Sequence, residues 1–245
     1  MPRSTVSAII ITKNEEHNIT TCLDSIRWVD EIIVLDSNST DRTVEICKEY
    51  DAKVFSVDWP GYGIQKQRAL DKASSYWVLS IDADEYLSEE LTENIKAVIE
   101  QDSCDACFIH RRLIFYGKEI KYCVGEDKLL RLAKKNKASF TQVPVHEKMQ
   151  VAGNVKNLQG LMYHRSFHSV SDIVARMNHY SSISPAAEKR KKKCLVLQAI
   201  SRGIWAFIRC YILKFGFLDG KAGLVFSISF AEGSYYRYLK MSYSN

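Results

Sequence analysis

Three carboxylates follow a run of apolar residues in the segment WVLSIDADEYL, residues 77–87. One alanine separates Asp82 from Asp84, and Glu85 follows directly. Side chains two residues apart on an extended chain point to the same side, so the spacing predicts that Asp82 and Asp84 project together. Such a pair needs a cation or hydrogen-bond donors nearby, and carboxylate oxygens suit Mg²⁺ or Mn²⁺ bound together with substrate phosphates. The alternative is an acidic loop before a helix that Ser88 caps, where negative charge is mildly favourable.

Alternating strand and helix patterns surround these carboxylates. Apolar, β-branched runs at 5–12, 31–37, 52–57 and 75–81 predict strands, and apolar residues at helical spacing predict helices between them, the first capped by Asn14. The alternation predicts an α/β fold with helices on both faces of a parallel sheet. Ligands of such sheets bind beyond the carboxyl ends of the strands, where the sequence places the polar clusters TKNEE, DSNSTD and DADE. We expect these clusters to converge in space.

Composition indicates a globular chain with a basic C-terminal quarter. Of the 245 residues, 46% are hydrophobic and only 4 are proline, which excludes a disordered or fibrous protein. Residues 186–245 hold 11 Lys and Arg against 3 Asp and Glu, although the whole chain has a net charge of only +5. The seven cysteines form no regular framework, which favours a reducing compartment, and the N-terminal apolar run is too short for a signal peptide.

The ordered motifs SAIIITKNEE, IIVLDSNSTDRT, GYGIQKQRAL and YWVLSIDADE resemble the family 2 glycosyltransferases of the GT-A fold, over about residues 5–91 with a weaker continuation to about 165. Within that family the chain is most similar to bacterial lipopolysaccharide-core β-1,4-glucosyltransferases, which act on inner-core heptose. The resemblance implies a GT-A domain over 1–168, with a Rossmann-like mixed sheet flanked by helices, and a helical region over 169–245. It also implies metal-assisted, inverting transfer of a hexose from a nucleotide-diphosphate sugar, for which UDP-glucose is our prediction.

The resemblance also assigns site residues. In that family the DxD motif, here Asp82 and Asp84, holds Mg²⁺ or Mn²⁺ on the diphosphate, and His164 resembles a late histidine near the metal. Asn14 and Asp36 could instead serve only as cap or turn residues, and Lys66 could be a solvated helix residue. The family often has Asn where this chain has Gln67. The donor-binding residues that the resemblance implies are Thr12, Asn14, Glu15, Asp36, Lys66, Gln67 and Asp82.

A single displacement needs one general base within hydrogen-bond reach of the acceptor hydroxyl and no covalent nucleophile. We favour Glu147 in the apolar stretch TQVPVHEK, and Asp127 in GEDKLLRLA is the second candidate. His146, beside Glu147, is a candidate for orienting the acceptor or the diphosphate. Arg131 is either a structural arginine or a diphosphate contact.

The C-terminal quarter contains a candidate membrane segment. Residues 194–213 are apolar except for a narrow polar seam at helical spacing, and two arginines in mid-span are costly in hydrocarbon. We therefore predict a helix lying in the interface, with the basic run KRKKK at 189–193 attracted to anionic headgroups. A core helix or an oligomer contact is the alternative. The predicted location is peripheral, on the cytoplasmic face of the inner membrane, beside a lipid-anchored saccharide acceptor. The tail FLDGKAGLVFSISFAEGSYYRYLK, from residue 217, also resembles that of the core transferases, without an evident role.

Two further functions compete with this prediction. One is transfer to a polyprenyl phosphate. The other is a non-catalytic membrane- or nucleic-acid-binding protein with a degenerate transferase core. We expect no nucleic-acid partner, because the basic run has no interleaved aromatic residues and no recognised nucleic-acid motif accompanies it.

Overall fold

The computed structural model of the protein describes residues 4–142, 147–167, 169–187 and 196–243. Contacts divide the chain into two compact units, which we call the sheet unit and the helical unit. The sheet unit comprises Met1–Arg111 and Asp127–His164, and the helical unit comprises Arg112–Glu126 and Arg165–Asn245. The segment 112–126 therefore groups with the C-terminal helices. The domain boundary predicted between residues 168 and 169 stays a prediction.

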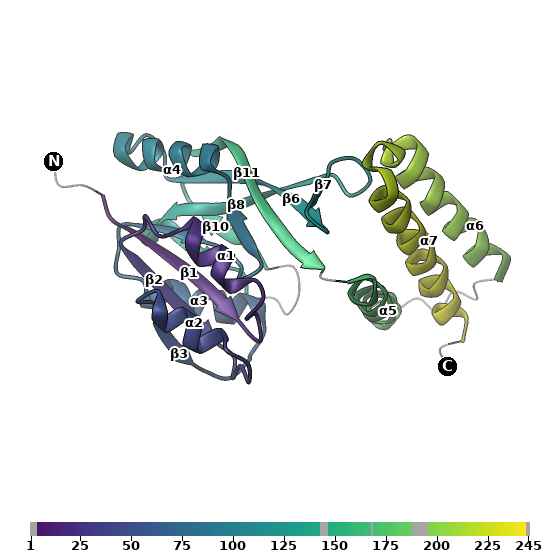
Figure 1. The fold of residues 1–245 in the computed structure, drawn as a ribbon, viewed down its shortest axis with the longest axis horizontal. Coiled ribbons are helices and arrows are strands. Elements are labelled where there is room, and N and C mark those ends of the chain that lie inside the picture. The colour runs from purple at the N-terminus through teal and green to yellow at the C-terminus, as the bar shows by residue number, and fades with distance from the viewer. Residues whose placement is uncertain (1–3, 143–146, 168, 188–195, 244–245) are drawn as a thin grey trace. The chain divides into compact units, whose positions relative to one another are not determined.

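Four parallel strands form the first half of the sheet unit (Figure 1). The strand β1 (Val6–Thr12) pairs with β2 (Glu31–Asp36) and β4 (Trp77–Ser80), and β2 pairs with β3 (Lys53–Ser56). All seven residues of β1 are buried, and its apolar residues are divided between two apolar clusters on opposite faces of the sheet. The predicted strands and the parallel arrangement of this half are confirmed.

Antiparallel strands complete the sheet. Within the described residues its strand order is β3-β2-β1-β4-β8-β6-β11-β5, with β7 paired to β6 and with β4 antiparallel to β8. Two short strands, β9 and β10, form a separate ribbon. The bounds of these strands are β5 (Glu85–Leu87), β6 (Ala106–Phe115), β7 (Lys118–Ile120), β8 (Glu126–Lys134), β9 (Ala138–Phe140), β10 (Met149–Val151) and β11 (Val155–Phe167). The sheet is therefore mixed, as predicted for a GT-A fold.

Helices cover both faces of the sheet. Apolar residues of α1 (Ile19–Ser25), α2 (Thr43–Glu49) and α4 (Glu89–Gln101) pack in one cluster, and those of α3 (Tyr62–Lys72) pack in the other. Ser88 caps α4 as predicted, because its hydroxyl accepts a hydrogen bond of 3.2 Å from the Leu91 N–H. The predicted cap of the first helix is wrong. That helix begins after Asn18, whereas Asn14 has a left-handed backbone, with φ of 56°.

The helical unit contains a pair of packed helices and a small apolar core. The helix α6 (Val196–Phe207) continues as a π-helix (Ile208–Leu213), and a 3₁₀ turn (Gly216–Asp219) leads into α7 (Gly220–Tyr243). Gly203 allows close packing of α6 on α7, because a Cβ at this position would lie 3.2 Å from the Ala231 carbonyl oxygen. The helix α5 (Val170–Ala187) lies within the region predicted to be helical, and the basic run 189–193 lies outside the described residues. The core consists of Leu113, Phe115, Ile120, Cys123, Ile173 and Phe226.

Candidate active site

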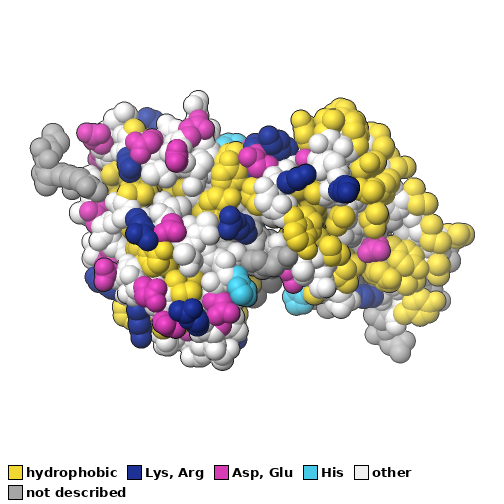
Figure 2. All heavy atoms as spheres, viewed as in Figure 1, with side chains coloured by type: hydrophobic (Ala, Val, Ile, Leu, Met, Phe, Trp, Pro, Cys, Tyr) yellow, Lys and Arg dark blue, Asp and Glu magenta, His cyan; other side chains and the backbone are white. Residues whose placement is uncertain are grey.

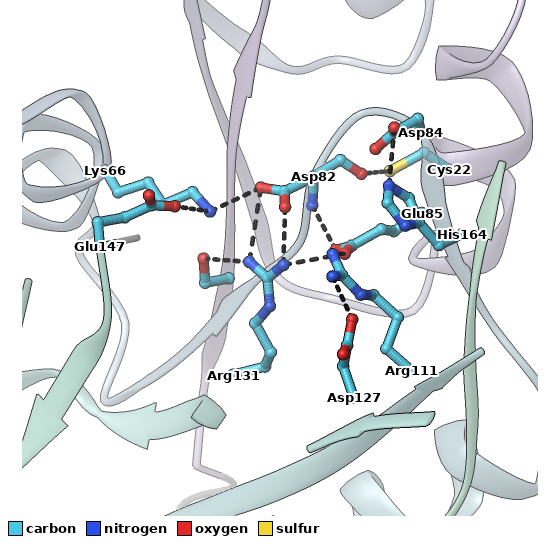
Figure 3. Close-up of polar contacts among 11 residues, drawn as sticks. Cys22, Lys66, Asp82, Asp84, Glu85, Arg111, Asp127, Arg131, Glu147 and His164 are labelled. Carbon is cyan, nitrogen blue, oxygen red and sulfur yellow. Dashed lines mark hydrogen bonds and ion pairs between the residues drawn. The ribbon is translucent and has the colours of Figure 1, made fainter. Parts of the chain in front are cut away.

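The carboxylates of the DxD segment lie where β4 ends and the chain turns. The Glu85 N–H donates to the Asp82 carbonyl oxygen at 2.9 Å, which closes a tight turn between β4 and β5. The expectation of an extended segment is therefore wrong. Asp82 and Asp84 have different partners (Figure 3), because the turn breaks the two-residue alternation of a strand.

Asp82 is held by two buried cations. Its carboxylate lies 2.7 Å from Arg131 Nη2 and 2.9 Å from Lys66 Nζ, and both of these side chains are only 7% exposed. Burial alone would raise the pKa of Asp82, but Arg131 and Lys66 hold that pKa well below its ordinary value of 3.8. Asp82 is therefore charged at every physiological pH. Arg131 also pairs with Glu85, so it has a structural role in this ion network. Its second predicted role, contact with the diphosphate, stays a prediction.

Glu85 is the buried centre of the same network and had no predicted role. Its side chain is fully buried and lies 2.9 Å from both Arg131 and Arg111, and its other oxygen accepts from the Asp82 N–H at 2.9 Å. Sequence reasoning also missed Arg111. The signals were a third carboxylate after the DxD motif and two consecutive arginines inside a strand pattern, since buried charges require partners.

Asp84 lies opposite His164. Antiparallel pairing of β5 with β11 places His164 beside Glu85, and His164 Nε2 then lies 2.9 Å from Asp84 Oδ2. Among the described residues, no three His, Cys, Asp or Glu side chains gather as a metal cage would require. Two protein ligands nevertheless fit Mg²⁺ or Mn²⁺, which commonly complete their coordination with waters and substrate phosphates. The donor set formed by Asp84 and His164 is thus compatible with a metal that the substrate helps to hold.

The two base candidates lie on different parts of the ion network. Lys66 Nζ is 2.9 Å from Glu147 Oε1, and the Glu147 side chain is 15% exposed. Asp127 pairs with Arg111 at 2.7 Å and is 61% exposed. Lys66 thus bridges Glu147 to Asp82, as Figure 3 shows. The residue before Glu147, His146, lies outside the described residues.

The predicted donor-binding residues of the first two strands lie at neighbouring carboxyl ends. Thr12 and Asp36 are adjacent in the register of β1 and β2, and both are buried. Asp36 accepts from the Ser39 N–H at 2.9 Å, and Asn14 Oδ1 accepts from the Thr40 N–H at 2.8 Å. Both side chains therefore shape the DSNSTD turn. Burial raises the pKa of Glu15, which accepts a hydrogen bond from Asn18.

Three consecutive polar residues of α3, Gln65, Lys66 and Gln67, contact different parts of the sheet unit. Lys66 is buried in the ion network rather than solvated. Gln67 accepts from the Phe140 N–H at 2.8 Å and donates to Asp71, so it connects α3 to β9. Gln65 was not predicted. It is fully buried and donates to Ser37 Oγ at 3.1 Å.

Two buried polar atoms near Ser37 are unsatisfied. Within the described residues, neither Gln65 Oε1 nor Thr12 Oγ1 has a hydrogen-bond partner. The Ser37 N–H donates to the Thr12 carbonyl oxygen at 2.9 Å, and the Ser37 hydroxyl accepts from Gln65. Buried polar atoms without partners are rare and call for an explanation such as a ligand or an ordered water. These two atoms flank Ser37, which directly follows the Asp36 end of β2.

Comparison with known proteins adds independent findings. The family model described as glycosyl transferase family 2 matches residues 7–151. A glycosyltransferase of Rickettsia typhi is 34% identical over 251 residues, which covers 96% of this chain and 86% of that protein. The lipopolysaccharide core biosynthesis glycosyltransferase LpsC of Rhizobium meliloti is 30% identical over 257 residues, covering 97% of this chain and 94% of LpsC.

A solved structure shares the fold. The structure of S. aureus TarS 1-349 in complex with UDP-GlcNAc matches with a TM-score of 0.52 at 16% identity, and the match covers 94% of this chain and 91% of that chain. At this level of identity the match concerns the fold alone.

Proposed function

The chain belongs to glycosyltransferase family 2, and from this premise we propose that it transfers a hexose, with glucose as our prediction, from a nucleotide-diphosphate sugar to the lipopolysaccharide inner core. The observation that carries the proposal is the cluster at the carboxyl ends of the parallel strands. There Asp82 is held by Lys66 and Arg131, and Asp84 faces His164. The similarity to LpsC along almost the whole chain supports an acceptor in the lipopolysaccharide core.

The donor would lie across the ends of β1, β2 and β4. We assign the nucleoside to the end formed by Thr12, Asp36 and Gln65, because the unsatisfied Thr12 hydroxyl and Gln65 carbonyl suit the polar edge of a base or ribose. Asp84 and His164 would hold Mg²⁺ or Mn²⁺. When bound, such an ion neutralises the charge that develops on the leaving diphosphate. Asp82 would act mainly through Lys66 and Arg131, since both of its oxygens are engaged by them.

The reaction would be a single displacement. The acceptor hydroxyl oxygen attacks the anomeric carbon, the bond from that carbon to the diphosphate oxygen breaks, and the nucleoside diphosphate leaves. The hydroxyl proton passes to a carboxylate, for which Glu147 is the first candidate and Asp127 the second. Lys66 holds Glu147 at 2.9 Å and Arg111 holds Asp127 at 2.7 Å, so either carboxylate has a fixed position from which to accept a proton.

A donor panel tests the function. Purified protein is incubated with UDP-glucose and other nucleotide sugars, with and without Mn²⁺ or Mg²⁺, and with deacylated inner-core oligosaccharide as the acceptor. We expect metal-dependent release of one nucleoside diphosphate that requires the acceptor. Release with a polyprenyl phosphate instead of the oligosaccharide would move the acceptor to that class. No turnover and no nucleotide binding would refute the function.

We also propose that the helical unit lies on the surface of an anionic membrane, where a lipid-anchored acceptor and a peripheral cytoplasmic enzyme would meet. The segment Val196–Leu213 is long and apolar enough to cross a membrane, by length and composition only, and 22% of it is buried. Small residues of α6 such as Ala199 and Gly203 are buried, and large apolar residues lie on its exposed face (Figure 2). Leu197, Ile200, Ile204 and Trp205 form that face on α6, and Ile208 and Ile212 continue it on the π-helix.

Vesicle binding tests the membrane surface. An amphipathic helix buries its apolar face in the interface, and burying one isoleucine side chain contributes about 1.5–3 kcal/mol. Ile204→Glu should therefore reduce binding to vesicles containing phosphatidylglycerol by roughly tenfold or more. Gln198→Glu, on an exposed position of the same helix outside the apolar face, is the control for added negative charge. Equal binding of both variants and the wild-type protein would refute this surface. A dimer that dissociates in Ile204→Glu would assign the face to a second copy instead.

A further inference from the structure

The tail motif FLDGKAG surrounds a carboxylate with an unusual set of partners. Asp219 accepts hydrogen bonds from three consecutive backbone N–H groups, at 2.9 Å from Lys121, 3.0 Å from Tyr122 and 2.9 Å from Cys123. A carboxylate that accepts several backbone N–H groups makes charge-assisted bonds, which are roughly twice as strong as neutral ones. Asp219 therefore fixes the middle of the loop between β7 and β8, although it lies 98 residues from Lys121.

Glycines in and beside this motif permit the close approach. A Cβ at Gly216 would lie 2.8 Å from the Cys123 Cβ and 2.5 Å from the Cys210 carbonyl oxygen. A Cβ at Gly223 would lie 1.8 Å from the Gly216 carbonyl oxygen and 2.9 Å from the Asp219 Cβ. Real Cβ atoms do not come this close to backbone, so both positions need glycine. The turn before α7 is thus built to place Asp219 against the loop.

The ends of the loop are held as well. Arg112 on β6 donates to Glu119 at 2.6 Å and to Glu126, which are the residues on either side of the Asp219 contacts. Cys123, in the middle of the loop, is buried in the apolar core of the helical unit together with Phe226. Three anchors therefore order the segment 119–126: Arg112 at both ends, and Asp219 and the apolar core in the middle.

The ordered loop leads directly into a candidate catalytic residue. Glu126 begins β8, and the next residue is Asp127, which pairs with Arg111. Arg111 and Arg112 are neighbours on one strand, and neighbouring side chains of a strand point to opposite faces. One arginine thus belongs to the ion network of the site and the other to the loop. The pairing of Glu126 with Arg112 therefore anchors the chain directly before Asp127.

We propose that Asp219 is a positioning residue for sugar transfer, which holds the loop 119–126 and so fixes the start of β8 at Glu126, directly before Asp127. This inference rests on the proposed function. In this inference the helical unit has a role in catalysis that does not depend on membrane binding. A misplacement of about 1 Å can cost roughly a hundredfold in rate, so loosening the loop should reduce transfer even to an acceptor without lipid.

The experiment uses Asp219→Asn in the full-length protein, with UDP-glucose and deacylated inner-core oligosaccharide. The substitution keeps the shape but turns one acceptor oxygen into an NH₂ group that faces backbone N–H donors. Glu232→Gln, an exposed carboxylate on α7, is the matched control. We expect faster hydrogen exchange of amides 121–123 and a kcat/KM for the oligosaccharide that is roughly ten- to a hundredfold lower. UDP affinity should change less than twofold, and the control should match the wild-type protein.

Each other outcome decides against the inference. Unchanged exchange in Asp219→Asn would show that the carboxylate does not hold the loop. Faster exchange with unchanged kcat/KM would show that the contact is only structural. If Asp219→Asn does not fold, Arg112→Lys tests the same loop from its ends, and unaltered transfer by that variant would overturn the proposal. A wild-type protein that transfers no sugar would refute the proposed function and this role with it, whereas active wild-type protein with an equally active Asp219→Asn would refute this inference alone.

Discussion

Replacing Arg131 should destabilise the sheet unit more than any exposed arginine does. The guanidinium is 7% exposed and is the shared partner of Asp82 and Glu85, at 2.7 and 2.9 Å. Arg131→Met keeps most of the side-chain volume but removes the charge. Lys66 and Arg111 would remain, so each carboxylate keeps one cation within 2.9 Å. The variant therefore leaves the buried network one positive charge short.

The expected magnitude follows from burial. Removing one partner of a buried ion pair costs roughly 3–5 kcal/mol, because the remaining charge stays desolvated. An exposed pair is worth roughly 0–1 kcal/mol. Arg27→Met, which removes the exposed pair with Asp24, is therefore the matched control. The ordinary stability of a domain is about 5–15 kcal/mol, so the loss in Arg131→Met would be a large part of it.

The loss should also depend on pH, with a defined sign. The folded-state pKa of Asp82 lies well below 3.8, so the stabilisation by its cations is present above that value and is lost as the pH falls through the folded-state pKa. The difference between wild-type protein and Arg131→Met should therefore be largest near neutral pH and shrink in acid. A difference that grows on acidification would contradict the assignment of Arg131 to Asp82.

Urea unfolding followed by tryptophan fluorescence measures the effect. In a Trp205→Phe background the three remaining tryptophans all lie in the sheet unit, and Trp77 is fully buried there. The signal then reports on the unit that contains Arg131. We expect the urea midpoint of Arg131→Met to be lower than that of the wild-type background. The midpoint of Arg27→Met should be almost unchanged. A free energy of unfolding within about 1 kcal/mol of the wild-type value would refute the argument, since that is the range of exposed pairs.

Three further predictions concern the site and its sheet. Asp84→Asn and His164→Asn should each lower Mn²⁺-dependent transfer by roughly a hundredfold or more, because the ion contributes several kcal/mol, and titration of Mn²⁺ into the UDP complex measures the loss directly. Of Glu147→Gln and Asp127→Asn, the variant of the true base should lose about 10²–10⁴-fold in kcat with UDP affinity retained, and equal modest losses would exclude both. Burial alone would raise the pKa of Glu31, but Lys53, Ser7 and Ser74 lower it to about 2. The stability deficit of Glu31→Gln should therefore be full above pH 4.5 and shrink as the pH falls towards 2, and a deficit constant from pH 6 to pH 2 would contradict these hydrogen bonds.

Local patterns were sufficient for the parallel half of the fold. Strand β1 is mostly apolar because both of its faces pack against helices, and a nearly continuous apolar run is the signature of such a strand. The α4 cap by Ser88 also depends only on residues within one turn. The same locality explains why the polar ends of β1, β2 and β4 could be expected at one edge of the sheet.

Partners far apart in sequence could not be predicted in the same way. Asp82 is 49 residues from Arg131, and Glu85 is 26 residues from Arg111. These distances reflect the antiparallel return of β8 and the position of β6, which a local pattern does not encode. The turn after Ser80 was missed for a related reason. The extended geometry assumed for Asp82 and Asp84 holds only while a strand continues, and the turn between β4 and β5 interrupts it.

The charges of the network bear on how a donor could bind. Three cations, Lys66, Arg111 and Arg131, face four carboxylates, which are Asp82, Glu85, Asp127 and Glu147. Asp84 adds a fifth carboxylate beside His164. A diphosphate entering this site would meet an excess of negative charge, and every cation of the network is already paired. A divalent cation held by Asp84 and His164 would offset the excess of two negative charges that five carboxylates leave against three cations, since a bound cation is often the largest local charge in a site. The charge balance of the network is therefore an argument for metal dependence that does not rely on the DxD spacing.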